Sequence, residues 1–73
     1  MAEKLDCKGL MCPMPIVKLS KAMKALNPGD TLEVTADDLA FEADVRAWCG
    51  KMKAPLKSLT KQGATTVVVI QKG

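Results

Sequence analysis

Two stretches of the chain repeat apolar residues at the spacing of an amphipathic helix. In residues 16–26, apolar side chains recur every three or four positions, and the lysines of that stretch fall off the stripe. In residues 41–52 the apolar repeat runs at four, three and four, and we expect this helix to start at Asp37-Asp38, whose carboxylates suit a helix N-terminus. Pro28-Gly29 ends the first helix, and Pro55 stops the second from continuing. Each predicted helix has a single apolar face.

The rest of the pattern is typical of strands. Residues 30–36 alternate between apolar and polar positions, which predicts a strand with one buried face. Residues 65–70 are almost entirely β-branched, and residues 4–7 can form a short strand. Residues 56–61 predict a weaker strand whose two leucines have opposite parity, so we expect a bulge or a bend there.

The last strand is apolar on both of its faces. On a one-sided sheet, one apolar pair, either Val67 and Val69 or Val68 and Ile70, is exposed unless a partner or a dimer covers it. A central strand with one residual apolar face is the simpler interpretation.

The order of these elements predicts an α/β fold. Strands that alternate with helices pair in parallel through crossover connections, and the last two strands form a hairpin. We therefore predict a two-layer sandwich of order βαβαββ, with a four-stranded mixed sheet and both helices on one face. A chain of 73 residues makes one domain, residues 1–73.

Composition narrows the chemistry that this domain can perform. The net charge is +3, and the chain contains no histidine, which excludes Ser-His and Cys-His dyads and removes the commonest metal ligand. The only aromatic residues are Phe41 and Trp48, so a base-stacking nucleic-acid platform lacks its usual side chains. What remains is three cysteines: Cys7, Cys12 and Cys49.

The cysteines and the apolar runs also predict a compartment. An odd number of cysteines does not suit a closed disulfide framework. The first residues lack the apolar region of a signal peptide, and the run 67–70 is far too short to span a membrane. We expect a protein of the reducing cytoplasm that carries free thiols and has no membrane partner.

The segment Cys12-Pro13-Met14-Pro15 lies where a loop meets the first helix. Proline suits the first turn of a helix, and if Pro13 is the first helical residue, Cys12 is the N-cap. Both prolines lack an N–H, so we expect the Met14 N–H to be the main free amide near the sulfur. Because a helix N-terminus favours the thiolate, the hypothesis is an exposed Cys12 with a lowered pKa. The alternative is a thiol that only caps the helix.

A second thiol close to Cys12 would point to disulfide exchange, but the spacing disfavours it. The resolving position of a Cys-x-x-Cys motif is occupied by Pro15. An extended chain places Cys7 about 16 Å from Cys12, whereas a disulfide needs Cα atoms within roughly 7 Å. Gly9 could let the loop fold back. A site with one thiol fits the covalent carriage of a group better than dithiol oxidation.

Residues 5–15 resemble the Cys-Pro-x-Pro signature of the TusA family, also called the SirA-like or YedF-like family. The resemblance covers nearly the whole chain. Four more segments fall where that family has similar features: Pro28-Gly29-Asp30, Ala36-Asp37-Asp38, Trp48-Cys49 and Ile70-Gln71-Lys72.

This resemblance implies a sulfur carrier with the fold predicted above. It implies that Cys12 accepts sulfane sulfur as a persulfide, from a cysteine desulfurase or a rhodanese-like donor, and passes it to an acceptor protein. The only group carried would be that covalent sulfur, with no other cofactor. The residues that would support the site are Pro13, Met14, Pro15, Lys8 and Gly9.

Three departures from the family pattern leave the pathway open among tRNA thiolation, molybdenum-cofactor supply and sulfur oxidation. Met14 occupies the variable motif position, where the tRNA-thiolation branch commonly has Glu. Leu39 replaces a Pro often found after the paired aspartates, and Lys53-Ala54-Pro55 replaces a common Gly-His pair.

The lysines near the motif have two interpretations. Lys8, Lys18 and Lys21 can dock an acidic partner beside Cys12, because complementary charge accelerates encounter. A lysine ridge can also meet nucleic-acid phosphates, but the small net charge and the single arginine disfavour this class. We expect no nucleic-acid partner and favour a monomer.

The other two cysteines are predicted to be core thiols. Cys7 shares strand parity with Leu5, and Cys49 lies at the edge of the second helix's apolar face. The alternative is an auxiliary redox role in a dithiol or regulatory module of the same fold. A zinc site built from the three thiolates would need a fourth ligand, and no histidine is available, so no metal is expected.

Overall fold

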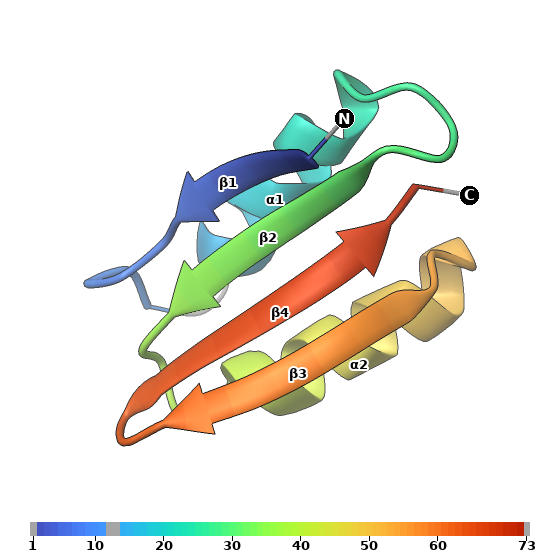
Figure 1. Ribbon diagram of the computed structural model, residues 1–73. Coiled ribbons are helices and arrows are strands. Elements are labelled where there is room, and N and C mark those ends of the chain that lie inside the picture. Colours follow the sequence, from blue (N-terminus) through green and yellow to red (C-terminus); the bar gives the residue numbers. More distant parts are fainter. Residues whose placement is uncertain (1, 12–13, 73) are drawn as a thin grey trace.

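The structure, a computed structural model, describes residues 2–11 and 14–72. Its elements follow the predicted order of strand, helix, strand, helix, strand, strand (Figure 1). Their bounds are β1 (Ala2–Asp6), α1 (Met14–Lys24), β2 (Thr31–Ala36), α2 (Phe41–Met52), β3 (Leu56–Gln62) and β4 (Thr65–Gln71).

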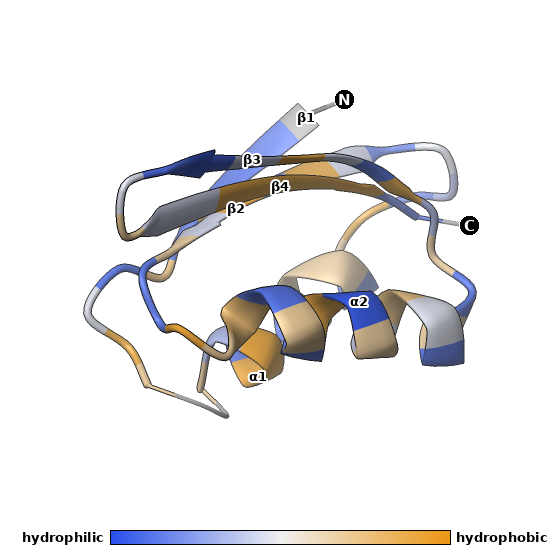
Figure 2. Ribbon diagram, turned by 90° about the horizontal axis from the view of Figure 1, so that it is seen from below, coloured by the Kyte–Doolittle hydropathy of each residue, from blue (hydrophilic) through white to orange (hydrophobic). Residues whose placement is uncertain are grey.

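The four strands form one mixed sheet in the order β1-β2-β4-β3. The pair β1 and β2 is parallel, while β4 runs antiparallel to both of its neighbours. Both helices lie on the same side of the sheet, as Figure 2 shows. The predicted two-layer α/β sandwich is therefore confirmed.

The core lies between the two layers, where the apolar faces of the helices meet one face of the sheet. β2 and β4 alternate between buried and half-buried residues, as the alternation of β2 predicts. The largest fully buried side chains include Phe41, Leu19, Leu32, Ile70 and Val34.

The two apolar faces of β4 find different environments. Val68 and Ile70 are completely buried against the helices, whereas Val67 and Val69 are half-buried on the open face of the sheet. β4 lies between β2 and β3, which confirms the central-strand interpretation. The expected irregularity in β3 is also present, since the register of β3 against β4 shifts between Leu56 and Ser58.

Some sequence-based boundaries and exposures were wrong. The first strand ends at Asp6, because Cys7 already turns away after its N–H donates to the carbonyl of Thr35 at 2.6 Å. α1 ends at Lys24, two residues before Leu26. The N–H groups of Ala25 and Leu26 donate to carbonyls three residues back, which is the pattern of a 3₁₀ turn. Met52 is 56% exposed, because α2 ends there and the chain turns at Lys53.

The connectivity places both helix N-termini at one end of the molecule. α1 and α2 each follow a strand of the parallel set, so they run in the same direction (Figure 1). The loops of residues 7–11 and 37–40 therefore lie at the same end of the sheet, where the parallel strands β1 and β2 have their carboxyl ends.

Candidate functional site

The loop after β1 is held in place by hydrogen bonds from its backbone. The Gly9 N–H donates to Oδ1 of Asp37 at 2.9 Å, which joins this loop to the loop after β2. The Lys8 N–H donates to Oδ1 of Asp6 at 2.9 Å. Gly9 has a φ of 82°, a left-handed conformation that glycine adopts without strain. The role of Lys8 and Gly9 in supporting the site stays a prediction.

The start of α1 follows that loop. Cys12 and Pro13 lie outside the described residues, so the predictions of an exposed thiol, a lowered pKa and a Cys12 N-cap remain predictions. The Met14 N–H donates to the carbonyl of Met11 at 2.8 Å. The expectation that this amide is free is therefore wrong, because the turn before α1 supplies an acceptor. Pro15, in the first turn of α1, is buried.

The paired aspartates do not start α2 as predicted. The helix begins at Phe41, and its N-cap residue, Ala40, provides no side-chain hydrogen bond. The carboxylate of Asp37 binds the Gly9 N–H instead, because the neighbouring loop offers it a backbone donor. Oδ2 of Asp38 is buried, and none of the described residues donates a hydrogen bond to it.

Exposed apolar side chains gather at this end of the molecule, which sequence reasoning missed. Met11 is 76% exposed and Leu39 is 94% exposed, on the two loops that the Gly9–Asp37 hydrogen bond joins. Met14 and Val17, on the first turn of α1, are also exposed. Exposed apolar surface of this kind is typical of an interaction site. The signal in the sequence was three apolar residues, Met11, Met14 and Leu39, within loops or a helix start.

The predicted docking lysines follow one side of α1. Lys18 and Lys21 are exposed, and their spacing from Met14 places all three on one stripe of the helix. Lys21 lies roughly 10 Å along the helix axis from Met14, at 1.5 Å per residue. Lys8 is exposed on the anchored loop. Lys18 and Lys21 therefore form a basic stripe along α1, and Lys8 lies on the loop before that helix.

Cys7, at the start of the anchored loop, is completely buried, as predicted. Burial raises the pKa of its thiol; the nearby Lys18 ammonium opposes that shift, and Asp6 adds to it. Burial also raises the pKa of Cys49, which is 6% exposed on α2. Both are therefore protonated core thiols, and their burial argues against dithiol exchange at the surface.

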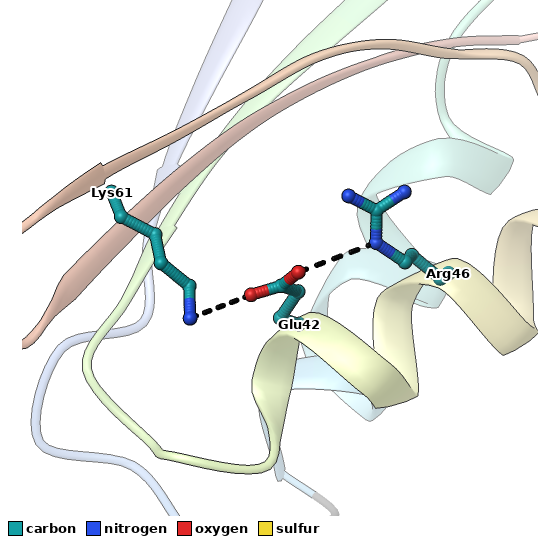
Figure 3. A network of polar contacts seen from close by, with 3 residues as sticks. All are labelled: Glu42, Arg46 and Lys61. Carbon is teal, nitrogen blue, oxygen red and sulfur yellow. Dashed lines mark ion pairs between the residues drawn. The ribbon is translucent and has the colours of Figure 1, made fainter.

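An ion-pair network on α2 has a structural role. Glu42 pairs through Oε1 with Nζ of Lys61 at 2.6 Å and through Oε2 with Nε of Arg46 at 3.5 Å (Figure 3). The hydrogen bond from Lys61 is the main reason why the pKa of Glu42 is lowered. This network ties the start of α2 to β3 and leaves Glu42 ionised, so it is not a proton donor for the site.

Within residues 2–11 and 14–72, no three His, Cys, Asp or Glu side chains are grouped so that they could hold a metal ion. No helix in that part of the chain has the length and hydropathy needed to cross a membrane.

Comparison with known proteins assigns a family to most of the chain. The family model described as "Sulfurtransferase TusA" matches residues 3–72. The chain is 45% identical over 69 residues to "Putative sulfur carrier protein YrkI" of Bacillus subtilis, and the match covers 94% of this chain and 92% of that relative.

Longer relatives contain a similar segment. The chain is 57% identical over 44 residues to "Putative sulfur carrier protein YrkF" of Bacillus subtilis, which is 60% of this chain and 24% of that relative. It is 34% identical over 68 residues to a "Putative sulfur carrier protein" of Aquifex aeolicus, which is 93% of this chain and 34% of that relative.

A crystal structure has the same fold. The SirA-like protein from Desulfitobacterium hafniense superposes with a TM-score of 0.82 at 22% identity, and 97% of each chain is covered. At this identity the likeness concerns the fold alone.

Proposed function

Because this chain belongs to the TusA family, we propose that it is a sulfur carrier in which Cys12 holds the sulfur as a persulfide. The observation that carries the proposal is the family match over residues 3–72, which includes Cys12 and the residues around it. The relatives named as sulfur carriers support the same role. The carried sulfur is covalent, and the proposal requires no other cofactor.

The proposed transfer is a pair of thiol exchange reactions. The Cys12 thiolate attacks the outer sulfur of a donor persulfide, R–S–SH, forming Cys12–S–SH while the S–S bond of the donor breaks and R–S⁻ leaves. An acceptor thiolate then attacks the outer sulfur of Cys12–S–SH and regenerates the Cys12 thiolate. Each step moves one sulfur atom without a net oxidant or reductant.

The surroundings of the motif suit a carrier that meets two partners in turn. The loop after β1 is fixed by the Gly9–Asp37 hydrogen bond, so the residues before Cys12 do not need to be ordered by each partner. The exposed side chains of Met11, Met14 and Leu39 offer apolar surface to an approaching protein. A carrier can use groups of its partners as acids and bases, so the absence of histidine is no obstacle.

The proposed partners are a sulfur donor, of the cysteine desulfurase or rhodanese-like class, and an acceptor protein. Lys8, Lys18 and Lys21 are proposed to attract acidic surfaces on these partners. Free thiols persist in a reducing compartment, so we also propose the cytoplasm as the location.

The direct test is sulfur loading followed by intact mass spectrometry. The protein is incubated with a persulfide donor, and the mass of one sulfur atom is expected on the wild type and on a Cys49→Ala control. Cys12→Ser is expected to gain none. A sulfur adduct that survives Cys12→Ser, or no adduct on the wild type, would show that the proposal is wrong.

A further inference from the structure

A hollow of about 270 Å³ opens between the C-terminal ends of α1 and α2. Its walls come from three parts of the chain: α1, the end of α2 with the turn after it, and the residue that follows β4. The helices run in the same direction, so the hollow lies at the end of the molecule opposite Gly9 and Asp37 (Figure 1). The lining residues that the argument uses are Met23, Lys24, Trp48, Met52, Lys53 and Lys72.

One part of the hollow is an apolar recess. Met23, Trp48 and Met52 line it: Met23 is buried, Trp48 is half-buried, and Met52 is exposed at the end of α2. These side chains offer a flat ring and two adaptable thioethers to an apolar body. Trp48 is the only tryptophan of the chain.

The charged part of the hollow is entirely basic. Lys24, Lys53 and Lys72 line it, and no acidic side chain among the described residues does so. Lysines at the C-terminus of a helix offset the negative end of the helix dipole, which explains why the charged side chains here are basic. That role does not require an apolar recess between them.

Lys72 is a cation with a fixed position. Its Nζ donates to the carbonyl of Leu26 at 2.6 Å and to that of Lys24 at 3.4 Å. A lysine ammonium has three N–H donors, so these two carbonyls do not use all of them. The carboxylate of Asp30 also interacts with Lys72 but does not line the hollow. Because two carbonyls already hold the ammonium of Lys72 in place, less side-chain entropy is lost when an anion binds it.

We propose that this hollow binds a small amphiphilic anion, with an apolar body in the recess beside Trp48 and a carboxylate on Lys72. At about 270 Å³ the hollow lies just below the range of pockets that hold drug-sized ligands, roughly 300–1,000 Å³, so it suits a smaller ligand such as an eight-carbon carboxylate. The proposal is independent of sulfur transfer, since the hollow includes none of the residues around Cys12.

Titration of Trp48 emission tests the site in the full-length protein. Octanoate, at constant ionic strength, is expected to change the emission with saturation. The matched compounds octan-1-ol and octyltrimethylammonium are expected to bind at least about tenfold more weakly, and acetate not at all. In amide NMR spectra, octanoate should shift Trp48, Lys24 and Lys53 more than Gly9.

Variants separate the charge from the apolar recess. Lys72→Met keeps an unbranched side chain but removes the ammonium, and it should weaken octanoate binding about tenfold. Lys24→Met is the second variant, in case the loss of the Lys72 hydrogen bonds prevents folding. Lys4→Met is the control, because Lys4 pairs with Glu33 on the opposite face of the sheet and should leave binding unchanged.

Four results would overturn the proposal. The first is no saturable change with octanoate, and the second is equally tight binding of octan-1-ol. The third is wild-type affinity in both Lys72→Met and Lys24→Met. The fourth is equally tight binding of an oligoglutamate peptide, which would mean that charge alone is recognised.

Discussion

Gly9 lies in the loop that precedes the proposed site, and Gly9→Ala tests whether its backbone conformation matters for stability and for sulfur loading. Its φ of 82° is in the left-handed region, and a Cβ placed on it meets nothing within 4 Å. The cost of the substitution is therefore conformational rather than steric. A left-handed alanine costs about 1–2 kcal/mol, and restriction of the unfolded chain returns about 0.5 kcal/mol. We expect Gly9→Ala to lower the free energy of unfolding by about 1 kcal/mol.

Two other glycines are matched controls for this substitution. Gly29 has a φ of 94°, its N–H also donates a hydrogen bond, to the carbonyl of Lys72, and its Cβ position is also open. Gly29→Ala should therefore destabilise by a similar amount at the other end of the molecule. Gly50 lies within α2 with open space at its Cβ position, so Gly50→Ala should stabilise by about 1 kcal/mol.

Urea unfolding, followed through Trp48 emission, measures these three free energies. Sulfur loading of the folded variants then separates stability from site geometry. Gly9→Ala should load more slowly, by as much as about a hundredfold if the loop shifts by an ångström, while Gly29→Ala should load like the wild type. The reasoning is refuted if Gly9→Ala is as stable as the wild type, or if both left-handed variants lose loading equally.

Three further predictions concern the core, the thiols and the ion pairs. Leu19→Ala, at a fully buried position, should lower the free energy of unfolding by about 3 kcal/mol in urea titration; a loss below about 1 kcal/mol would contradict it. At pH 8, a thiol reagent should modify one cysteine of the native protein and all three after unfolding, because burial raises the pKa of Cys7 and of Cys49; rapid modification of either in the native state would contradict this. The pKa of Glu42 is lowered in the folded state, so its contribution to stability is present above the pKa of an unfolded glutamate and is lost as pH falls through the folded value. Glu42→Gln should therefore flatten the acid limb of the stability curve, and an unchanged limb would show that the ion pair with Lys61 contributes nothing.

Periodicity in the sequence was enough to predict the layers of this fold. The alternation in β2 and the apolar stripes of the helices report burial directly, since each side chain's direction follows from its position in the element. The central place of β4 followed from its two apolar faces. The bulge in β3 followed from the opposite parity of Leu56 and Leu59.

Contacts between loops could not be predicted in the same way. Asp37 was interpreted as part of a helix start, because local chemistry favours an acidic residue there. Its actual partner, the Gly9 N–H, is 28 residues away in the sequence and comes within reach only through the parallel pairing of β1 and β2. The same holds for Lys72, whose ammonium meets the carbonyls of Lys24 and Leu26 only because β4 ends beside α1.

The one parallel strand pair explains why the proposed site lies where it does. A hairpin would return the chain beside β1 at once, whereas a parallel partner requires a crossover, which here is α1. The crossover starts at the end of the sheet where β2 also ends, so Gly9, three residues before Cys12, meets the loop that contains Asp37 and Leu39. The antiparallel pairing of β4 instead brings the C-terminal Lys72 to the opposite end, between the ends of the two helices. The mixed sheet therefore gives a small domain two separate ends, one for the proposed sulfur transfer and one for the proposed anion.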